Sequence, residues 1–191
     1  YECWVPASLQ QRLFDLLMEA GESHGIHLFG LRALDSMRFD KGFGAWASEF
    51  RPIYTPGEAG LDSFVALRTV DGADRDFVGR DAVAAARTTG PTRRLCLFTL
   101  DDGGIPVGRD SGTDVLGDEP IWHGGDVVGW ATSGGYAHWS QASCAMGYVP
   151  ADVADPTAPA DSFEIEVLGV RRPATRRDEP LFDPSGSRMR G

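Results

Sequence analysis

The stretch from Val127 to Tyr148 reads VVGWATSGGYAHWSQASCAMGY. Apolar and small polar residues alternate along it and glycines interrupt it, which is the pattern of short β-strands joined by tight turns. Similar stretches flank it on both sides, at Arg94 to Leu100, Pro120 to Trp122 and Phe163 to Leu168. The sequence therefore predicts a small β-barrel or sandwich over the second half of the chain.

Glycine pairs punctuate this half at Gly103-Gly104, Gly124-Gly125 and Gly134-Gly135, and we interpret all three as hairpin turns. Ser133 is not expected to be a nucleophile, because the elbow motif needs glycine where Ala131 stands. Neither a phosphate-binding GxxxxGK[ST] motif nor a dinucleotide-binding GxGxxG motif occurs after a strand. These absences exclude nucleotide hydrolysis and a Rossmann cofactor site within these residues.

The first half is expected to be partly helical. Ser8 is predicted to cap a helix whose apolar stripe, Leu9 to Ala20, ends at Gly21. A second helix is predicted from Phe29 to Phe39, with an apolar face of Leu31, Leu34 and Met37, and a short third helix from Gly79 to Arg87.

Between the second and third helices, Phe43 to Ala59 has no clear periodicity, and we expect an ordered loop packed by Trp46, Phe50 and Tyr54. Thr88 to Thr92 holds a Gly-Pro pair and is the best candidate for a boundary. We therefore predict two domains, residues 1–90 and 91–191.

The formal net charge is -10, which argues against nucleic acid as a partner, because phosphate binding needs clustered Lys and Arg. The bunched pairs Arg93-Arg94, Arg171-Arg172 and Arg176-Arg177 can meet an anionic ligand or simply form a solvated surface, and the second interpretation is favoured.

Cysteine usage indicates a reducing compartment, because Cys3, Cys96 and Cys144 are far apart and odd in number. A cytoplasmic location and buried free thiols are expected. The four histidines lack the spacing of a metal site, and no apolar run is long enough to span a membrane. The chain opens with Tyr1 in what resembles the end of a strand, Tyr1 to Val5, which indicates a fragment.

One segment, Gly30 to Gly60, reads GLRALDSMRFDKGFGAWASEFRPIYTPGEAG. It resembles the aminomethyltransferase family, which includes the glycine cleavage T-proteins and the folate domains of dimethylglycine and sarcosine dehydrogenases. In that family a G-L-x-A-x-x-S-[LM]-R-[LF]-[ED]-[KA]-G helix end precedes W/Y-G-x-D and T-P-x-E-A-G-L. The resemblance continues in order through Asp76 to Ala82, Gly129 to Tyr136, Ala145 to Pro150 and Pro180 to Pro184. The dehydrogenase branch is the more similar, on Lys41-Gly42, Ala45-Trp46 and Phe182-Asp183-Pro184.

The resemblance implies an α+β fold: part of a split α/β folate-binding domain, followed by a small antiparallel β-barrel. It implies tetrahydrofolate as cofactor and a small methylated amine as donor of the one-carbon group. The family's catalytic aspartate lies in its N-terminal half, so none of these residues is expected to be catalytic and the fragment alone is expected to be inactive. FAD is implied only for an upstream domain, and the N-terminal part of the same protein is implied as partner.

In the family the acid of R-[LF]-[ED] binds the pterin ring, and it falls here on Asp40. A pterin edge presents two parallel N–H donors and a carboxylate two parallel acceptors. Phe39 and Lys41 are implied to flank it. Asp40 is a methylene shorter than the usual Glu, which sets its carboxylate back by roughly 1 Å and would weaken such bonds. Without the resemblance, Asp40 would be read as a helix cap or as a partner of Arg38 or Lys41.

Three further positions are implied more loosely. Arg32 and Thr92 stand near positions where dehydrogenase relatives have tyrosines, and both are departures from the pattern. Arg68 lies close to a folate-contacting arginine of T-proteins, and the ordinary alternative is a surface arginine on a strand. Two alternatives stay open. One, suggested by these departures, is a degenerate folate-binding or regulatory module without catalysis, and the other is a folate-dependent demethylase that shares the scaffold but has no flavin domain.

Overall fold

The computed structural model describes residues 2–101 and 114–190. They divide into two compact units, residues 1–34 and 35–191. The predicted turn at Gly103-Gly104 lies outside the described residues. The predicted boundary near residue 90 stays a prediction, although the first barrel strand begins just after it, at Arg93.

The first unit contains a 3₁₀ turn, Ala7–Leu9, followed by α1, Gln10–Gly21, and a second 3₁₀ turn, Glu22–His24. The predicted helix is confirmed and ends at Gly21 as expected. Ser8 is not its cap, because it lies within the 3₁₀ turn and Leu9 precedes α1. Glu2 to Val5 form no strand, so the expectation of a strand there is wrong.

Helix α2 spans Leu31–Lys41, and its residues from Asp35 on belong to the second unit. This unit also contains a 3₁₀ turn at Asp62–Phe64, α3 at Arg80–Thr89 and α4 at Ser187–Arg190. The predicted apolar face of α2 is wrong: Leu31, Leu34 and Met37 are exposed. The buried residues are Ser36, Phe39 and Asp40. The sequence pattern favoured burial of the face with the larger apolar side chains. The helix instead buries the face that carries one phenylalanine and two small polar residues.

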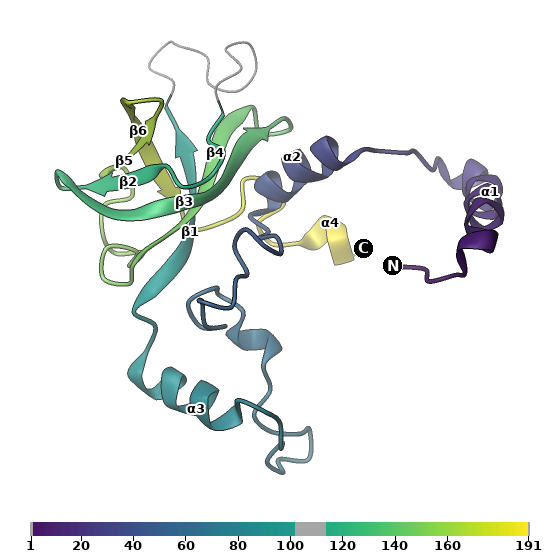
Figure 1. Ribbon diagram of the computed structural model, residues 1–191, viewed down its shortest axis with the longest axis horizontal. Coiled ribbons are helices and arrows are strands. Elements are labelled where there is room, and N and C mark those ends of the chain that lie inside the picture. The colour runs from purple at the N-terminus through teal and green to yellow at the C-terminus, as the bar shows by residue number, and fades with distance from the viewer. Residues whose placement is uncertain (1, 102–113, 191) are drawn as a thin grey trace. The chain divides into compact units, whose positions relative to one another are not determined.

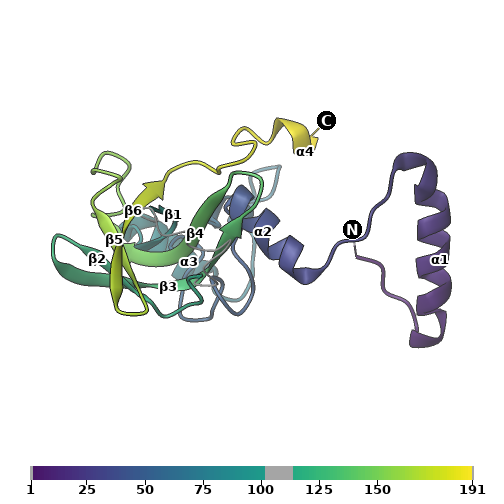
Figure 2. The same cartoon turned by 90° about the horizontal axis from the view of Figure 1, so that it is seen from above.

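A closed antiparallel barrel forms the core of the second unit (Figures 1 and 2). Its strands are β1 Arg93–Leu100, β2 Pro120–His123, β3 Asp126–Ala137, β4 Ala142–Pro150, β5 Phe163–Val167 and β6 Val170–Arg177. They are ordered β1-β4-β3-β2-β5-β6, and β6 pairs with β1. The prediction of a small barrel is confirmed.

Strand β6 was missed by the sequence analysis because its arginine pairs resemble a solvated surface. A barrel strand has one face outside, so outward charges are compatible with it. The surface interpretation is wrong for Arg176, which is 3% exposed. Its guanidinium pairs with Asp178 at 3.0 Å and donates to the carbonyl of Val153 at 3.0 Å.

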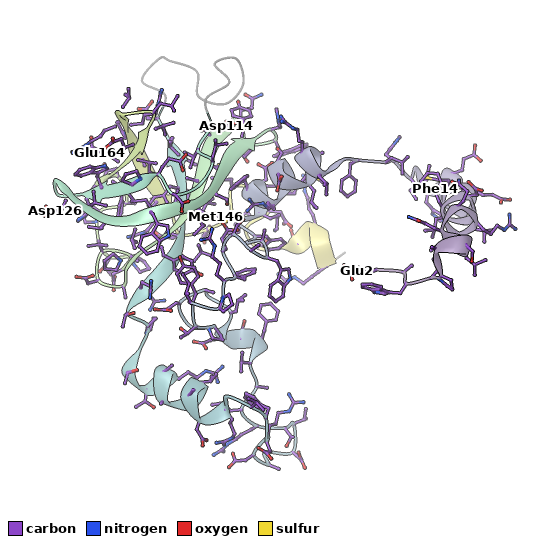
Figure 3. All side chains as sticks on the ribbon, in the orientation of Figure 1. Glu2, Phe14, Asp114, Asp126, Met146 and Glu164 are labelled. Atoms are coloured by element: carbon purple, nitrogen blue, oxygen red, sulfur yellow. The ribbon has the colours of Figure 1, made fainter. Side chains whose placement is uncertain are left out.

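Both faces are buried in β1 from Cys96 to Leu100 and in β4 from Ser143 to Val149. Inside the barrel, Phe98 meets Phe163 with ring centroids 5.2 Å apart. On the outer face, Leu97, Cys144 and Met146 pack against Phe39 of α2. Met146 accordingly lies among the crowded side chains of the barrel region (Figure 3). The barrel therefore fixes the end of α2.

The glycine pairs have two different roles. Gly124 and Gly125 have positive φ and form the β2–β3 hairpin turn, as predicted. Gly134 and Gly135 lie within β3, so that turn prediction is wrong. A Cβ at Gly134 would lie 2.3 Å from Val115 Cβ, so this pair provides room for close packing.

Candidate functional site

Asp40 fastens the last turn of α2 to the β3–β4 turn. Its carboxylate is buried, and Oδ1 accepts hydrogen bonds from the Ser140 N–H at 3.1 Å and the Ser140 hydroxyl at 2.5 Å. Oδ2 accepts one from the Trp139 N–H at 3.3 Å. One helical turn earlier, the Ser36 hydroxyl accepts from the His138 N–H at 2.9 Å. The acid that the family resemblance selects therefore has a structural task.

A pterin edge fits this arrangement only in part. A carboxylate offers about four acceptor positions, and three are taken. One further donor finds a position on Oδ2, but a bidentate pair needs one position on each oxygen, and Oδ1 already accepts two bonds from Ser140. If both oxygens of Asp40 bound the pterin edge, one of the two hydrogen bonds from Ser140 to Oδ1 would be displaced.

The other predicted folate residues are in different places. Phe39 is buried against the barrel, and Lys41 Nζ donates to the Asp183 carbonyl at 2.7 Å. The Thr92 hydroxyl donates to Glu58 Oε1 at 2.9 Å. Arg68 is exposed and lies 3.5 Å from Asp74. Arg32 is exposed and belongs to the first unit.

Glu49, for which the sequence indicated no role, is the most enclosed acid among the described residues of the second unit. It is fully buried and accepts hydrogen bonds from the Thr132 and Ser133 hydroxyls at 2.6 Å each. The Ala45 N–H donates at 2.8 Å and Arg38 Nη1 at 3.3 Å. The pairing of β3 with β4 shifts register between Ala131 and Ser133, at the place where two consecutive hydroxyls, those of Thr132 and Ser133, bond to the same carboxylate. Glu49 thus joins α2, the loop after it and the barrel.

Glu58 connects the same loop to the start of β1. Its Oε2 accepts from the Thr55 N–H at 2.9 Å while the Thr55 hydroxyl accepts from the Glu58 N–H at 3.3 Å, the reciprocal pair of a capping box. Oε1 accepts from Thr92 and from Arg93 Nε. Burial alone would raise the pKa of Glu58, but the hydrogen bonds from Thr55, Thr92 and Arg93 outweigh it and hold that pKa below its ordinary value. The T-x-x-E spacing was the signal that could have found it.

The loop from Phe43 to Ala59 is ordered, as predicted, although its aromatics differ in role. Tyr54 is buried and stacks on Tyr148 of β4 at 3.6 Å between ring centroids. Trp46 is 85% exposed and touches Phe50 edge-on, so the prediction that it packs the loop is only partly right.

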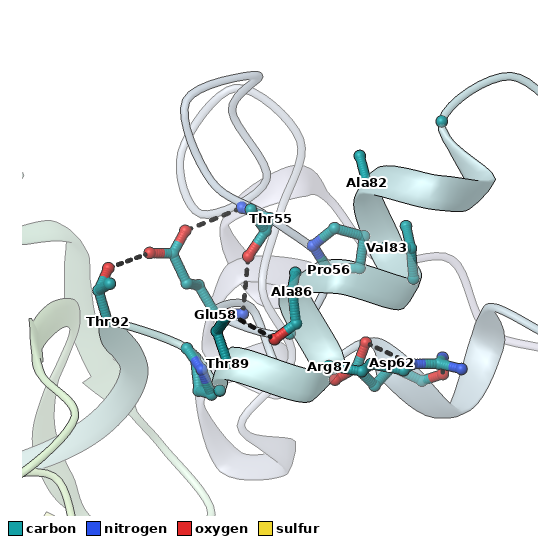
Figure 4. Close-up of a pocket in the computed structure, with 14 residues that line it drawn as sticks. Thr55, Pro56, Glu58, Asp62, Ala82, Val83, Ala86, Arg87, Thr89 and Thr92 are labelled. Atoms are coloured by element: carbon teal, nitrogen blue, oxygen red, sulfur yellow. Dashed lines mark hydrogen bonds and ion pairs between the residues drawn. The ribbon is translucent and has the colours of Figure 1, made fainter.

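Cavities of the second unit include one of 510 Å³, which lies between α3 and the segment from Thr55 to Asp62 (Figure 4). A second, of 420 Å³, is lined by Trp46, Phe50 and Tyr54, and a third, of 180 Å³, adjoins Leu97 and Arg177. Asp40 lines none of these three.

Within residues 2–101 and 114–190, no three His, Cys, Asp or Glu side chains are grouped closely enough to hold a metal ion. No helix in the same residues has the length and apolarity needed to cross a membrane.

Comparison with known protein families matches two consecutive models in order. Residues 1–69 match the GCVT N-terminal domain, and residues 93–183 match the glycine cleavage T-protein C-terminal barrel domain. The chain belongs to the aminomethyltransferase family. A crystal structure of the glycine cleavage system aminomethyltransferase T from Bartonella henselae has the same fold, with a TM-score of 0.72 at 21% identity over 94% of this chain and 45% of that one.

Curated members of the aminomethyltransferase family extend the comparison. Mitochondrial dimethylglycine dehydrogenase from Rattus norvegicus is 36% identical over 179 residues, 93% of this chain and 19% of that protein. The formaldehyde-forming 4-methylaminobutanoate oxidase from Paenarthrobacter nicotinovorans is 32% identical over 191 residues, all of this chain and 21% of the oxidase. The chain thus spans about a fifth of the length of these relatives.

Proposed function

We propose that this chain is the C-terminal part of a tetrahydrofolate-dependent one-carbon transfer protein, in a flavoenzyme similar to dimethylglycine or sarcosine dehydrogenase. The observation that carries the proposal is the match of the N-terminal domain model and then the C-terminal barrel model along this chain. A small methylated amine is the proposed donor, because the relatives named above act on dimethylglycine and 4-methylaminobutanoate.

Tetrahydrofolate, when bound, supplies the nitrogen that accepts the one-carbon group. The proposed task of this chain is binding and orientation. Asp40 hydrogen-bonds the pterin edge from the rigid end of α2, with Phe39 and Lys41 beside it. Arg32, Arg68 and Thr92 remain predictions as further contacts. FAD, the catalytic acid and the N-terminal part of the folate domain are proposed to belong to the rest of the protein. A cytoplasmic location also stays a prediction, and the rat relative is a mitochondrial protein.

Calorimetric titration with tetrahydrofolate tests the role of Asp40. We expect weak binding by this chain, which Asp40→Ala abolishes. Tight binding that survives the substitution would show that Asp40 is not the folate acid.

Ser140→Ala is the matched control, because it removes one donor to Asp40 Oδ1 and leaves the carboxylate in place. If Asp40 binds the pterin directly, this variant keeps or gains folate affinity, since an acceptor position becomes available. An equal loss in both variants would mean that Asp40 acts only by holding the turn.

A second candidate is a degenerate module that has the scaffold but no catalysis. It is favoured by the three hydrogen bonds that hold the Asp40 carboxylate and by the bond from Thr92 to Glu58. The third possibility, a folate-dependent demethylase without a flavin domain, would bind folate as the first does. Methylene transfer after the N-terminal half is restored separates the degenerate module, which would show none, from the other two, and a dinucleotide fingerprint upstream selects the flavoenzyme.

A further inference from the structure

The 510 Å³ cavity beside α3 has mainly apolar walls, and Asp40 does not line it. Its volume of 510 Å³ falls within the range of small-molecule sites, about 300 to 1,000 Å³. Apart from Arg87, the side chains of α3 that line it are small, so the space between this helix and the loop opposite is not filled. Its apolar lining consists of Pro56, Ala82, Val83, Ala86 and Pro91.

Glu58 supplies a negative charge on one side of this cavity (Figure 4). Its side chain is more than nine-tenths buried. Oε1 accepts two hydrogen bonds, whereas Oε2 accepts only the one from the Thr55 N–H among the described residues. Because each carboxylate oxygen has two lone pairs, Oε2 keeps one position for a further donor.

Arg87 and Asp62 lie on the other side of Pro56 and Ala86 in Figure 4. Arg87 Nε donates to Asp62 Oδ1 at 3.3 Å, and Nη2 donates to the Val65 carbonyl at 2.6 Å. Nη1 has no hydrogen-bond partner within residues 2–101 and 114–190. Arg87 Nη1 can therefore donate a hydrogen bond to a ligand on this side of the cavity, and Glu58 Oε2 can accept one on the other side.

The charges around the cavity balance. Glu58 pairs with Arg93 and Asp62 pairs with Arg87, so two negative and two positive groups sum to zero. A neutral molecule that carries both charges fits such a site better than an ion of either sign, because neither of its ends meets an excess of like charge.

We propose that this cavity binds a zwitterionic N-methylated amino acid, with the ammonium N–H on Glu58 Oε2, the carboxylate on Arg87 Nη1 and the methyl groups against Ala82 and Ala86. The proposal rests on the proposed function for the presence of a methylated amine, and it gives that amine a site on this chain. Ala86 sets the room available to the ligand.

Binding of 4-(methylamino)butanoate and N,N-dimethylglycine to the full chain tests the proposal by calorimetry and ligand-observed NMR. We expect saturable binding with a Kd of millimolar order. Butanoate lacks the ammonium and N-methylbutylamine lacks the carboxylate, so each should bind on the order of tenfold more weakly. If butanoate or N-methylbutylamine binds as tightly as the zwitterion, the proposed charge pairing is overturned.

Two variants locate the site. Glu58→Gln removes the charge at nearly constant shape, and Ala86→Leu fills the cavity from α3; each should weaken binding on the order of tenfold. Ala85→Leu is the matched control, since Ala85 is exposed, does not line the cavity, and undergoes the same change on the same helix. Unchanged binding by Ala86→Leu, together with a higher melting temperature, would show that the cavity is only a packing gap.

The tetrahydrofolate titration is run separately on the same samples. Folate binding without amine binding would overturn this inference and leave the proposed function standing. Amine binding that responds to Glu58 and Ala86, without folate binding, would support the site and remove the folate role.

Discussion

Replacing Glu49 by alanine should destabilise the second unit more than the loss of a surface acid does. The side chain is fully buried and holds four donors from α2, the loop that follows it and β3. Its removal leaves the Thr132 and Ser133 hydroxyls buried without this acceptor and deprives Arg38 of one carboxylate. Breaking a buried pair of this kind costs about 3 to 5 kcal/mol. With a urea m-value of about 2 to 3 kcal/mol/M, the unfolding midpoint should fall by roughly 1 to 2.5 M.

Urea unfolding followed by circular dichroism measures this shift. Glu49→Gln keeps the shape and one acceptor oxygen, so it should cost less, about 1 to 2 kcal/mol. Glu179→Ala is the control, because Glu179 is exposed and makes no hydrogen bond or ion pair with the described residues, and it should change stability by no more than about 0.5 kcal/mol. A midpoint for Glu49→Ala that matches that of Glu179→Ala would refute the role of Glu49 as the junction of helix, loop and barrel.

Two further predictions concern titrating groups. Burial raises the pKa of Cys96 to about 11 and that of Cys144 to about 12, so a thiol reagent at about pH 8 should modify only the exposed Cys3 until the chain is unfolded; mass spectrometry counts the adducts, and two or more on the native chain would contradict this. The pKa of Glu58 is held below its ordinary value of 4.5, so its contribution to stability is complete above that value and is lost as the pH falls through the lower pKa of the folded state. The difference in urea midpoint between wild type and Glu58→Gln should therefore be largest near about pH 6 and shrink near about pH 3, whereas a difference that grows in acid would assign the stabilisation to another group.

The elements that could be predicted from the sequence are those whose pattern is local. The helix ending at Gly21 and the strands β1 and β4 have their own periodicity, and Gly124-Gly125 has the composition of the turn that it forms. Strand β6 was missed because its arginine pairs resemble a solvated surface and because its burial depends in part on β1, which is about eighty positions away in sequence. Gly134-Gly135 was misassigned because only Val115 and the ring of Phe39 show why side chains are excluded there.

The candidate site divides in the same way. Family resemblance selected Asp40, but no sequence pattern indicates that Ser140 lies against it across about a hundred residues. Glu49 and Glu58 lie in the segment that carries the resemblance, and their partners on β3 and at the start of β1 lie 83 and 35 residues further along the chain. A buried acid is recognisable from sequence only when its donors are near it in the chain, as Thr55 is to Glu58.

The pairing of β6 with β1 has a consequence for biosynthesis. Leu97 lies opposite Arg177, eighty positions later, so the ring cannot close until nearly all of the second unit has left the ribosome. Until then the hydrogen-bonding groups along one side of β1 have no strand to pair with, and loop closure over such a distance is slow. We infer that the nascent chain passes through a state in which the barrel is not closed. A chain truncated before residue 170 would stay in this aggregation-prone state rather than form a smaller folded protein.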